Sequence, residues 1–241
     1  MTAPRRESKP RPLIGATLIS ARSLAEYRVM FALTNDDLER RILDCPGGAA
    51  SVVTDAAQFG QHVVAVDPVY AAGRTWLAGH AVEEAIRGNV HTAAAYESYV
   101  WSFFTDAADH RRKRVAAAER FGADLMANPQ RYVAGALPDL PFRDGAFDLV
   151  LSSHLLFMYA DRLDEEFHVH ALREMVRVAR GEVRVFPLLA DSGALLLGLR
   201  RQLMEALRGD GMEVEIRPSA YEFQRHGTEM MIVRGDIHSS A

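Results

Sequence analysis

Cysteine is nearly absent from this sequence, which has a single one, Cys45, among its 241 residues. A lone cysteine cannot form a disulfide within the chain, and it cannot build a thiolate cluster around a metal ion. Because disulfides mark oxidising compartments, we expect a protein of the reducing cytoplasm. No metal site is expected either, since His168 and His170 are two residues apart on a predicted helix and point to different faces.

Long hydrophobic runs and an excess of positive charge are lacking as well. The longest apolar runs, such as residues 194–197, are far shorter than the roughly 20 residues that cross a bilayer. No apolar segment follows Arg5 and Arg6, as a secretory signal would require. Lys and Arg number 28 against 32 Asp and Glu, a net charge of −4. We therefore expect neither a membrane nor a nucleic-acid partner; the oligomeric state stays open.

What the sequence does contain is an alternation of short apolar segments with amphipathic ones. Hydrophobic residues make up 49% and charged residues 25%, close to the globular average. The length suits one large domain. We predict a single α/β domain over residues 13–241. Residues 1–12 hold three prolines and four basic side chains, and we predict a flexible tail there.

Strands are predicted where short apolar runs suggest a sheet buried on both faces. These runs are residues 41–44, 62–67, 131–134, 146–153, 182–187, 213–217 and 229–233. The connection between the last two is too short for a crossover helix, so this pair is predicted to be antiparallel. Helices are predicted over residues 23–31, 49–59, 164–179 and 193–207.

The segment from about residue 70 to residue 130 is longer than an ordinary crossover between strands. Its composition predicts a helical insertion before the third strand. Two or three helices are expected there, over residues 72–87, 92–104 and 107–127.

Two features at the ends of the first two strands indicate a ligand site. Small residues in the turn after Asp44 let a ligand approach the backbone closely, and a helix start offers unpaired N–H groups. Asp67 ends the second strand, where a carboxylate accepts hydrogen bonds from ribose hydroxyls; the alternative is an exposed loop acid. Together these features fit a dinucleotide site and an S-adenosylmethionine site equally well.

Three segments decide between those two sites. They are Asp44-x-Pro46-Gly47-Gly48, Val66-Asp67-Pro68, and Leu140-Pro141-Phe142 followed by Phe147-Asp148-Leu149-Val150. In this order they resemble the class I S-adenosylmethionine-dependent methyltransferases, over about residues 38–233. A closer resemblance is to uncharacterised bacterial methyltransferase-like proteins. It rests on Tyr27-x-x-Met30-Phe31, the turn Gly47-Gly48-x-Ala50-Ser51, Trp101 and the segment from Ser152 to Tyr159.

The resemblance implies a Rossmann-like sheet of seven strands with helices on both faces and an antiparallel last strand. It also implies S-adenosylmethionine as the cofactor. Asp44 with Pro46, Gly47 and Gly48 would hold its methionine part, and Asp67 with Pro68 its ribose. Ala136 and Leu137 would contact adenine, and Tyr27, Ser152 and Ser153 would complete the pocket.

The glycine turn departs from the family pattern. Pro46 and Ala50 stand where relatives have glycine, and Pro46 has no N–H to donate. Gly135 is followed by Ala136 where many relatives carry an acid that bonds the adenine amino group. Adenine would therefore rest on apolar surface and backbone groups.

His154 and Tyr159 are the candidate catalytic residues, because their segment leaves the fourth strand facing the methyl donor. A histidine there could take a proton from a hydroxyl, amine or thiol acceptor. Methyl transfer depends mainly on positioning, so a base is not obligatory. The alternative is that His154 only packs the loop.

Two groups of residues in the insertion can each be interpreted in two ways. The basic segment 110–114 could bind phosphate, although a solvated basic face is the favoured interpretation. The aromatic cluster, including Tyr99, Trp101 and Phe104, could cover the cofactor as a lid on a helix or form the insertion's own core. We predict that Trp101 belongs to a lid.

The sequence therefore predicts an S-adenosylmethionine-dependent methyltransferase that acts on a small-molecule acceptor. A non-catalytic S-adenosylmethionine-binding or partner-binding protein is the first alternative. An NAD-dependent oxidoreductase is the second alternative, although such an enzyme would be expected to have glycine or alanine in place of Pro46.

Overall fold

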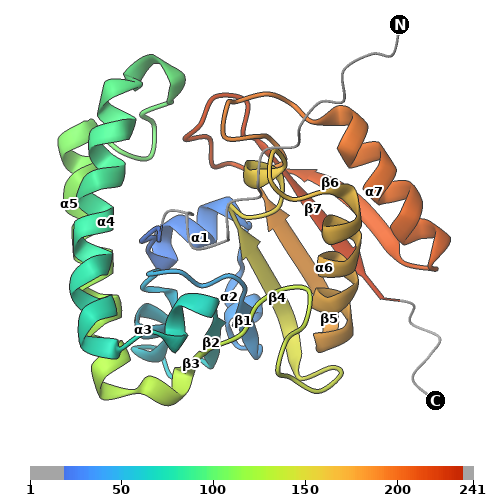
Figure 1. Cartoon of the computed structure of the whole chain (residues 1–241), viewed down its shortest axis with the longest axis horizontal. Helices are drawn as coiled ribbons and strands as arrows, with labels where there is room; N and C mark the ends of the chain where they lie inside the picture. Colours follow the sequence, from blue (N-terminus) through green and yellow to red (C-terminus); the bar gives the residue numbers. More distant parts are fainter. Residues whose placement is uncertain (1–18, 236–241) are drawn as a thin grey trace, which may run out of the picture.

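A twisted sheet of seven strands forms the centre of the protein (Figure 1). The computed structural model describes residues 19–235, so the tail predicted at residues 1–12 lies outside the described residues. The strand order is β3-β2-β1-β4-β5-β7-β6. The strands are β1 (Ile42–Asp44), β2 (Val63–Val66), β3 (Tyr132–Val133), β4 (Phe147–Ser153), β5 (Ala179–Phe186), β6 (Glu213–Pro218) and β7 (Glu229–Arg234).

The first five strands pair in parallel, whereas β7 runs antiparallel to both β5 and β6. This arrangement confirms the predicted class I methyltransferase sheet, including its antiparallel last strand. All parallel strands end at the same edge of the sheet, which is where ligands bind in such folds.

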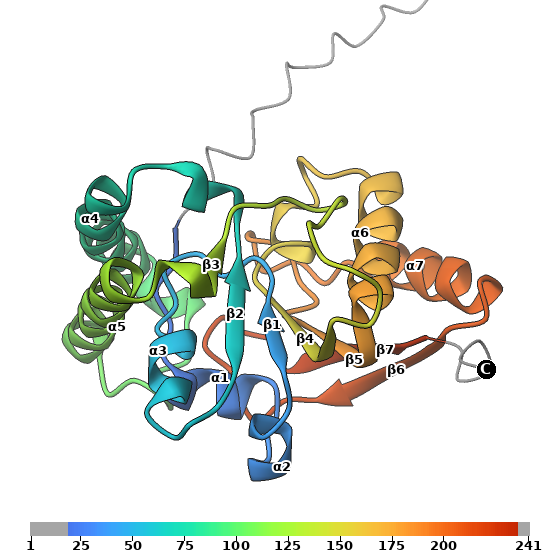
Figure 2. The same cartoon turned by 90° about the horizontal axis from the view of Figure 1, so that it is seen from below.

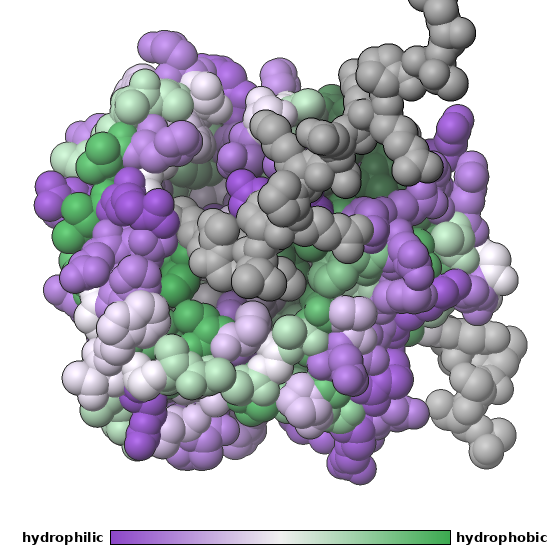
Figure 3. Space-filling view, in the orientation of Figure 1, coloured by the Kyte–Doolittle hydropathy of each residue, from purple (hydrophilic) through white to green (hydrophobic). Residues whose placement is uncertain are grey.

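Helices cover both faces of the sheet (Figures 1 and 2). On one face lie α1 (Leu24–Met30), α3 (Val52–Ala57), α4 (Arg74–Ala94) and α5 (Ala107–Ala127). On the other lie α6 (Glu165–Val178) and α7 (Leu197–Gly209). The short helix α2 (Asn35–Leu38) precedes β1. Hydrophilic residues cover much of the surface around α6 and α7, on the right of Figure 3, as expected for amphipathic helices with their apolar sides on the sheet.

Alternation along the strands divides the buried side chains between two hydrophobic cores. In β1, Ile42 belongs to the core under α1, α3, α4 and α5, and Leu43 belongs to the core under α6 and α7. Strands buried on both faces show no polar alternation, which explains why continuous apolar runs located them.

The insertion before β3 contains two long helices, not three. α4 continues to Ala94, and the helix predicted over residues 92–104 does not form; only a 3₁₀ turn (Tyr96–Ser98) follows. Val100 N–H donates to the Phe223 carbonyl, and Arg225 N–H donates to the Ser98 carbonyl. Contacts with the β6–β7 connection therefore replace the helix at this point.

Two boundaries near β5 and α7 also differ from the prediction. β5 begins at Ala179, so Gly181 lies within the strand and does not cap α6. α7 begins at Leu197, four residues after Gly193, because Ala190 and Ala194 pair across a turn that precedes the helix.

The basic segment 110–114 is only partly a solvated face. Residues 111–113 are exposed, but His110 and Arg114 are 4% and 7% exposed. Both terminal nitrogens of the Arg114 guanidinium donate to the Glu26 carboxylate of α1, which also accepts from the Tyr221 hydroxyl. The predicted solvated face is wrong for Arg114 because its charge is matched inside the protein.

No helix within residues 19–235 is long and apolar enough to cross a membrane.

Replacing Arg114 by methionine should lower the free energy of unfolding by about 3–5 kcal/mol, because it leaves the buried Glu26 carboxylate with only the more distant guanidinium of Arg22 to balance its charge. The exposed neighbour Arg112 pairs with Asp109 at the surface, and its replacement by methionine should cost less than about 1 kcal/mol. Urea unfolding of the three proteins measures both values. Equal losses in the two variants would contradict the structural role given to Arg114.

Candidate functional site

A cavity of about 630 Å³ opens at the edge of the sheet where β1, β2 and β4 end. The loop after β3 forms one wall, and α4 of the insertion forms another. It brings together many of the residues that the sequence nominated. These are Pro46, Gly48, Asp67, Pro68, Ala136, Leu137, Ser153, His154 and Tyr159. Tyr27, Asp44, Gly47 and Ser152 do not line it.

Asp67 stands at the tip of β2 and holds the glycine turn in place. One carboxylate oxygen accepts from Gly48 N–H and the other from Val69 N–H, both at 2.9 Å. Burial raises the pKa of Asp67, while these two N–H bonds act in the opposite direction. A carboxylate has about four acceptor positions, so Asp67 retains capacity for hydroxyl groups of a ligand in the cavity.

The glycines of the turn serve the packing of the protein itself. A Cβ on Gly47 would come within 2.7 Å of the Ala65 side chain and 2.6 Å of the Tyr70 hydroxyl. Gly48 has a φ of +53°, in the left-handed region. Its carbonyl accepts from the Tyr70 hydroxyl.

The N–H groups of the turn are already paired within the protein. Gly47 N–H donates to the Val66 carbonyl, and Ala49 N–H donates to the Ser20 carbonyl. Ala50 N–H donates back to Gly47, and Gly48 N–H is held by Asp67. The turn therefore does not form the open ring of donors that a phosphate would need.

Asp44 and Tyr27 lie beneath the cavity floor. Asp44 is 1% exposed; one carboxylate oxygen accepts from the Tyr27 hydroxyl at 3.0 Å, and the other has no hydrogen-bond partner among the described residues. Burial raises the pKa of Asp44 to about 8; the Tyr27 hydrogen bond lowers it and the charge of Asp67 raises it. The Ser152 hydroxyl, also buried, lacks a partner in the described part of the chain too.

His154 lies where the first cavity meets a second one. Its φ is +55°, its N–H donates to the Phe186 carbonyl, and its Nδ1 lies 2.8 Å from the Ser153 hydroxyl. Burial, followed by the charges of Arg22 and Arg114, holds the pKa of His154 well below its ordinary value. The imidazole is thus neutral and suited to hydrogen bonding, but it is a weak base in this state.

The second cavity, of about 360 Å³, lies between α4, the segment before α1, and the loops after β4 and β5. It shares five lining residues with the first: Ser20, Glu84, Arg87, His154 and Tyr159. The two spaces therefore meet beside His154.

The predicted aromatic lid is wrong for Trp101 and Phe104, neither of which lines either cavity. Phe104 is 1% exposed, and both rings pack edge-on against Phe223 of the β6–β7 connection. This contact buries Phe104 and partly buries Trp101 in the junction between the insertion and the last two strands. Tyr99, from the same cluster, does line the second cavity.

α4 supplies cavity residues that the sequence reasoning missed. Trp76 and His80, one turn apart, stack with their ring centroids 4.5 Å apart, and Glu84 and Arg87 continue the same helix face. The i, i+4, i+8 spacing of these polar and aromatic residues was the available signal.

Asp44→Asn should change how stability depends on pH. Since the folded pKa of Asp44 lies above its ordinary value of 3.8, the folded protein retains a proton that the unfolded chain has lost between about pH 4 and pH 8. As the pH rises through this range, the stability of the wild type should therefore fall relative to that of the variant, by up to about 1.4 kcal/mol per pH unit. Urea unfolding at pH 5, 6 and 7 measures this, with Asp139→Asn as an exposed control. A pH-independent difference between wild type and Asp44→Asn would show that Asp44 ionises normally.

The chain is similar to known proteins in sequence and in fold. Residues 87–186 match the family described as "Methyltransferase domain". An uncharacterized protein of Methanocaldococcus jannaschii is 26% identical over 224 residues, which cover 90% of this chain and 96% of that protein.

Two solved structures with sequence identities of 13% are also similar. One is a putative S-adenosylmethionine-dependent methyltransferase from Methanococcus maripaludis, with a TM-score of 0.44 over 90% of this chain and 85% of that one. The other is magnesium protoporphyrin IX methyltransferase from Synechocystis with bound S-adenosylhomocysteine, with a TM-score of 0.42 over 81% and 74%.

The family match contains α5, α6 and the three strands β3, β4 and β5 of a sheet whose strand order and antiparallel β7 were established independently. Residues 87–186 thus have the sequence of a methyltransferase domain, and the chain as a whole has the fold of the class I S-adenosylmethionine-dependent methyltransferases.

Proposed function

We propose that the first cavity holds S-adenosylmethionine and that the enzyme transfers its methyl group to a small molecule. The observation that carries this proposal is the pair of neighbouring carboxylates, Asp67 at the cavity and Asp44 beneath its floor. The charge of Asp67 disfavours ionisation of Asp44, so this end of the cavity favours a cation. S-adenosylmethionine carries two positive groups, a sulfonium and an ammonium.

The residues of the cavity fit the parts of this cofactor. Asp67 has acceptor capacity for the ribose hydroxyls, and Pro68 follows it on the same wall. Ala136 and Leu137 offer apolar surface to adenine. The methionine part would lie toward Pro46, Gly48 and Ser153. Ionisation of Asp44 beside an ammonium would relieve the cost of its unpaired oxygen.

The same features disfavour a dinucleotide. A pyrophosphate needs N–H donors or cations at the turn, but the N–H groups of Gly47, Gly48, Ala49 and Ala50 are already paired. The Asp67 carboxylate, at the wall of the cavity, would also repel its negative charge.

The cofactor supplies an electrophilic methyl group, which an acceptor nucleophile takes by in-line displacement as the carbon–sulfur bond breaks and its electron pair goes to sulfur. The acceptor must lose a proton if the nucleophile is a hydroxyl, thiol or amine. His154 is placed to accept a hydrogen bond at the junction of the two cavities. Its low pKa indicates that orientation of the acceptor is its main contribution.

A small acceptor fits the space available beyond His154. The second cavity holds about 360 Å³, within the range of small-molecule pockets. Ser152 and Tyr27 would act from behind the wall, through packing and through Asp44.

Asp67→Ala should weaken binding of S-adenosylhomocysteine by about 1.5–3 kcal/mol, the scale for losing hydrogen bonds to a charged group. Calorimetric titration measures this. Asp139→Ala removes an exposed acid outside the cavity and should bind as wild type does. Unchanged affinity in Asp67→Ala would overturn the ribose assignment.

Tryptophan fluorescence should report cofactor binding through one residue. The chain has two tryptophans; Trp76 lines the first cavity and is 55% exposed, whereas Trp101 lines neither cavity. Titration with S-adenosylhomocysteine should change the emission of wild type and Trp101→Phe but not that of Trp76→Phe. A change that follows Trp101 would put the ligand elsewhere.

A further inference from the structure

The second cavity holds more positive than negative charge. Four arginines line it, Arg22, Arg87, Arg114 and Arg162, against two acids, Glu84 and Asp191. Glu84 is engaged by two hydrogen bonds from Arg87. The Glu26 carboxylate, behind the wall, accepts hydrogen bonds from both terminal nitrogens of Arg114.

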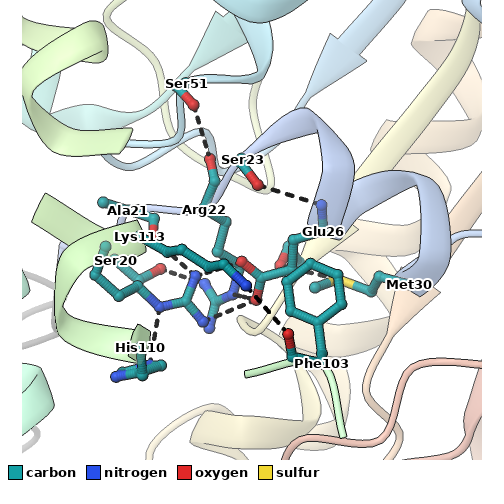
Figure 4. Close-up of polar contacts among 12 residues, drawn as sticks. Ser20, Ala21, Arg22, Ser23, Glu26, Met30, Ser51, Phe103, His110 and Lys113 are labelled. Carbon is teal, nitrogen blue, oxygen red and sulfur yellow. Dashed lines mark hydrogen bonds and ion pairs between the residues drawn. The ribbon is translucent and has the colours of Figure 1, made fainter. Parts of the chain in front are cut away.

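Arg22 is a buried arginine whose charge is only partly matched by the residues that the structure describes. Its side chain is 12% exposed, and its Nε lies 3.6 Å from the Glu26 carboxylate, too far for a hydrogen bond (Figure 4). Among residues 19–235, that Nε has no hydrogen-bond partner, and the guanidinium donates one side-chain hydrogen bond, to the neutral Ser20 hydroxyl. Two guanidinium groups therefore share one buried carboxylate.

This excess of positive charge shifts the pKa values of neighbouring groups. Burial and the charge of Arg114 lower the pKa of Arg22, although Glu26 acts in the opposite direction. The charges of Arg22 and Arg114 also contribute to the low pKa of His154. A buried cation without a full partner is costly, and a ligand anion would remove that cost.

We propose that the second cavity is the acceptor site and that the methyl acceptor carries an oxyanion, a carboxylate or a phosphate, which pairs with Arg22. This rests on the proposed function, since the two cavities meet at His154. The anion at Arg22 orients the acceptor so that its nucleophilic atom lies toward the first cavity. Arg87, whose side chain is 67% exposed, lies on the wall that both cavities share.

The test uses benzoate and inorganic phosphate as probes, each titrated by calorimetry at constant ionic strength, without and with saturating S-adenosylhomocysteine. We expect wild type to bind one of the two probes, which also tells a carboxylate from a phosphate site. Arg22→Met should weaken that binding about tenfold or more. Arg28→Met, at an exposed arginine of α1 outside this cavity, should leave it unchanged.

A second variant, expected to strengthen probe binding, keeps the test valid if Arg22→Met fails to fold. Asp191 lines the same cavity and is exposed, so Asp191→Asn should strengthen probe binding by about two- to threefold through loss of repulsion. Unchanged or weaker probe binding in Asp191→Asn would overturn the proposal.

The cofactor titration separates this proposal from the one on which it rests. Arg22→Met should bind S-adenosylhomocysteine as wild type does. If its affinity falls instead, Arg22 serves the carboxylate of the cofactor and the acceptor proposal is wrong. Failure of wild type to bind S-adenosylhomocysteine would overturn the proposed function alone, because the probe titrations without it are read separately. Binding of neither probe to wild type would overturn the oxyanion site.

Discussion

The buried ion pair between Glu26 and Arg114 is the interaction on which the arrangement of the site depends. It joins α1 to α5 of the insertion, and through the Tyr221 hydroxyl it also ties in the connection between β6 and β7. Three segments distant in sequence thereby meet on one side of the sheet. Because this carboxylate is hydrogen-bonded to both terminal nitrogens of Arg114, the charge of Arg22 beside it is only partly matched by the described residues.

The two cavities consequently differ in electrostatic character. The first cavity has Asp67 at its wall and Asp44 beneath its floor, an end that suits a cationic methyl donor, whereas arginines line the second cavity. His154 lies between them, with its neutral form favoured. A cationic donor and an anionic acceptor would each have a cavity of opposite sign, which assists binding and orients the two reactants toward each other.

Much of the fold could be predicted from sequence because buried parallel strands need continuous apolar runs. Val63–Val66 and Phe147–Ser153 were located on that basis. The prediction failed over residues 92–104, where aromatic side chains found partners in the β6–β7 connection. It failed again at Arg114, because the sequence around a charged helix residue does not indicate that a carboxylate 88 positions away pairs with it. Such contacts are set by tertiary packing, which local pattern does not encode.

The sequence by itself determined the strands of the sheet and the strand ends at which Asp67 and Ser153 lie, and it predicted the cofactor, since these follow from short motifs fixed to a regular alternation of elements. The tertiary structure decided which of the nominated residues meet. It put Tyr27 and Asp44 beneath the cavity and moved Trp101 into the packing between the insertion and the last strands. It also brought Trp76 and His80 to the cavity wall. The physical reason is that burial, unmatched charge and enclosed volume arise only when distant segments pack together.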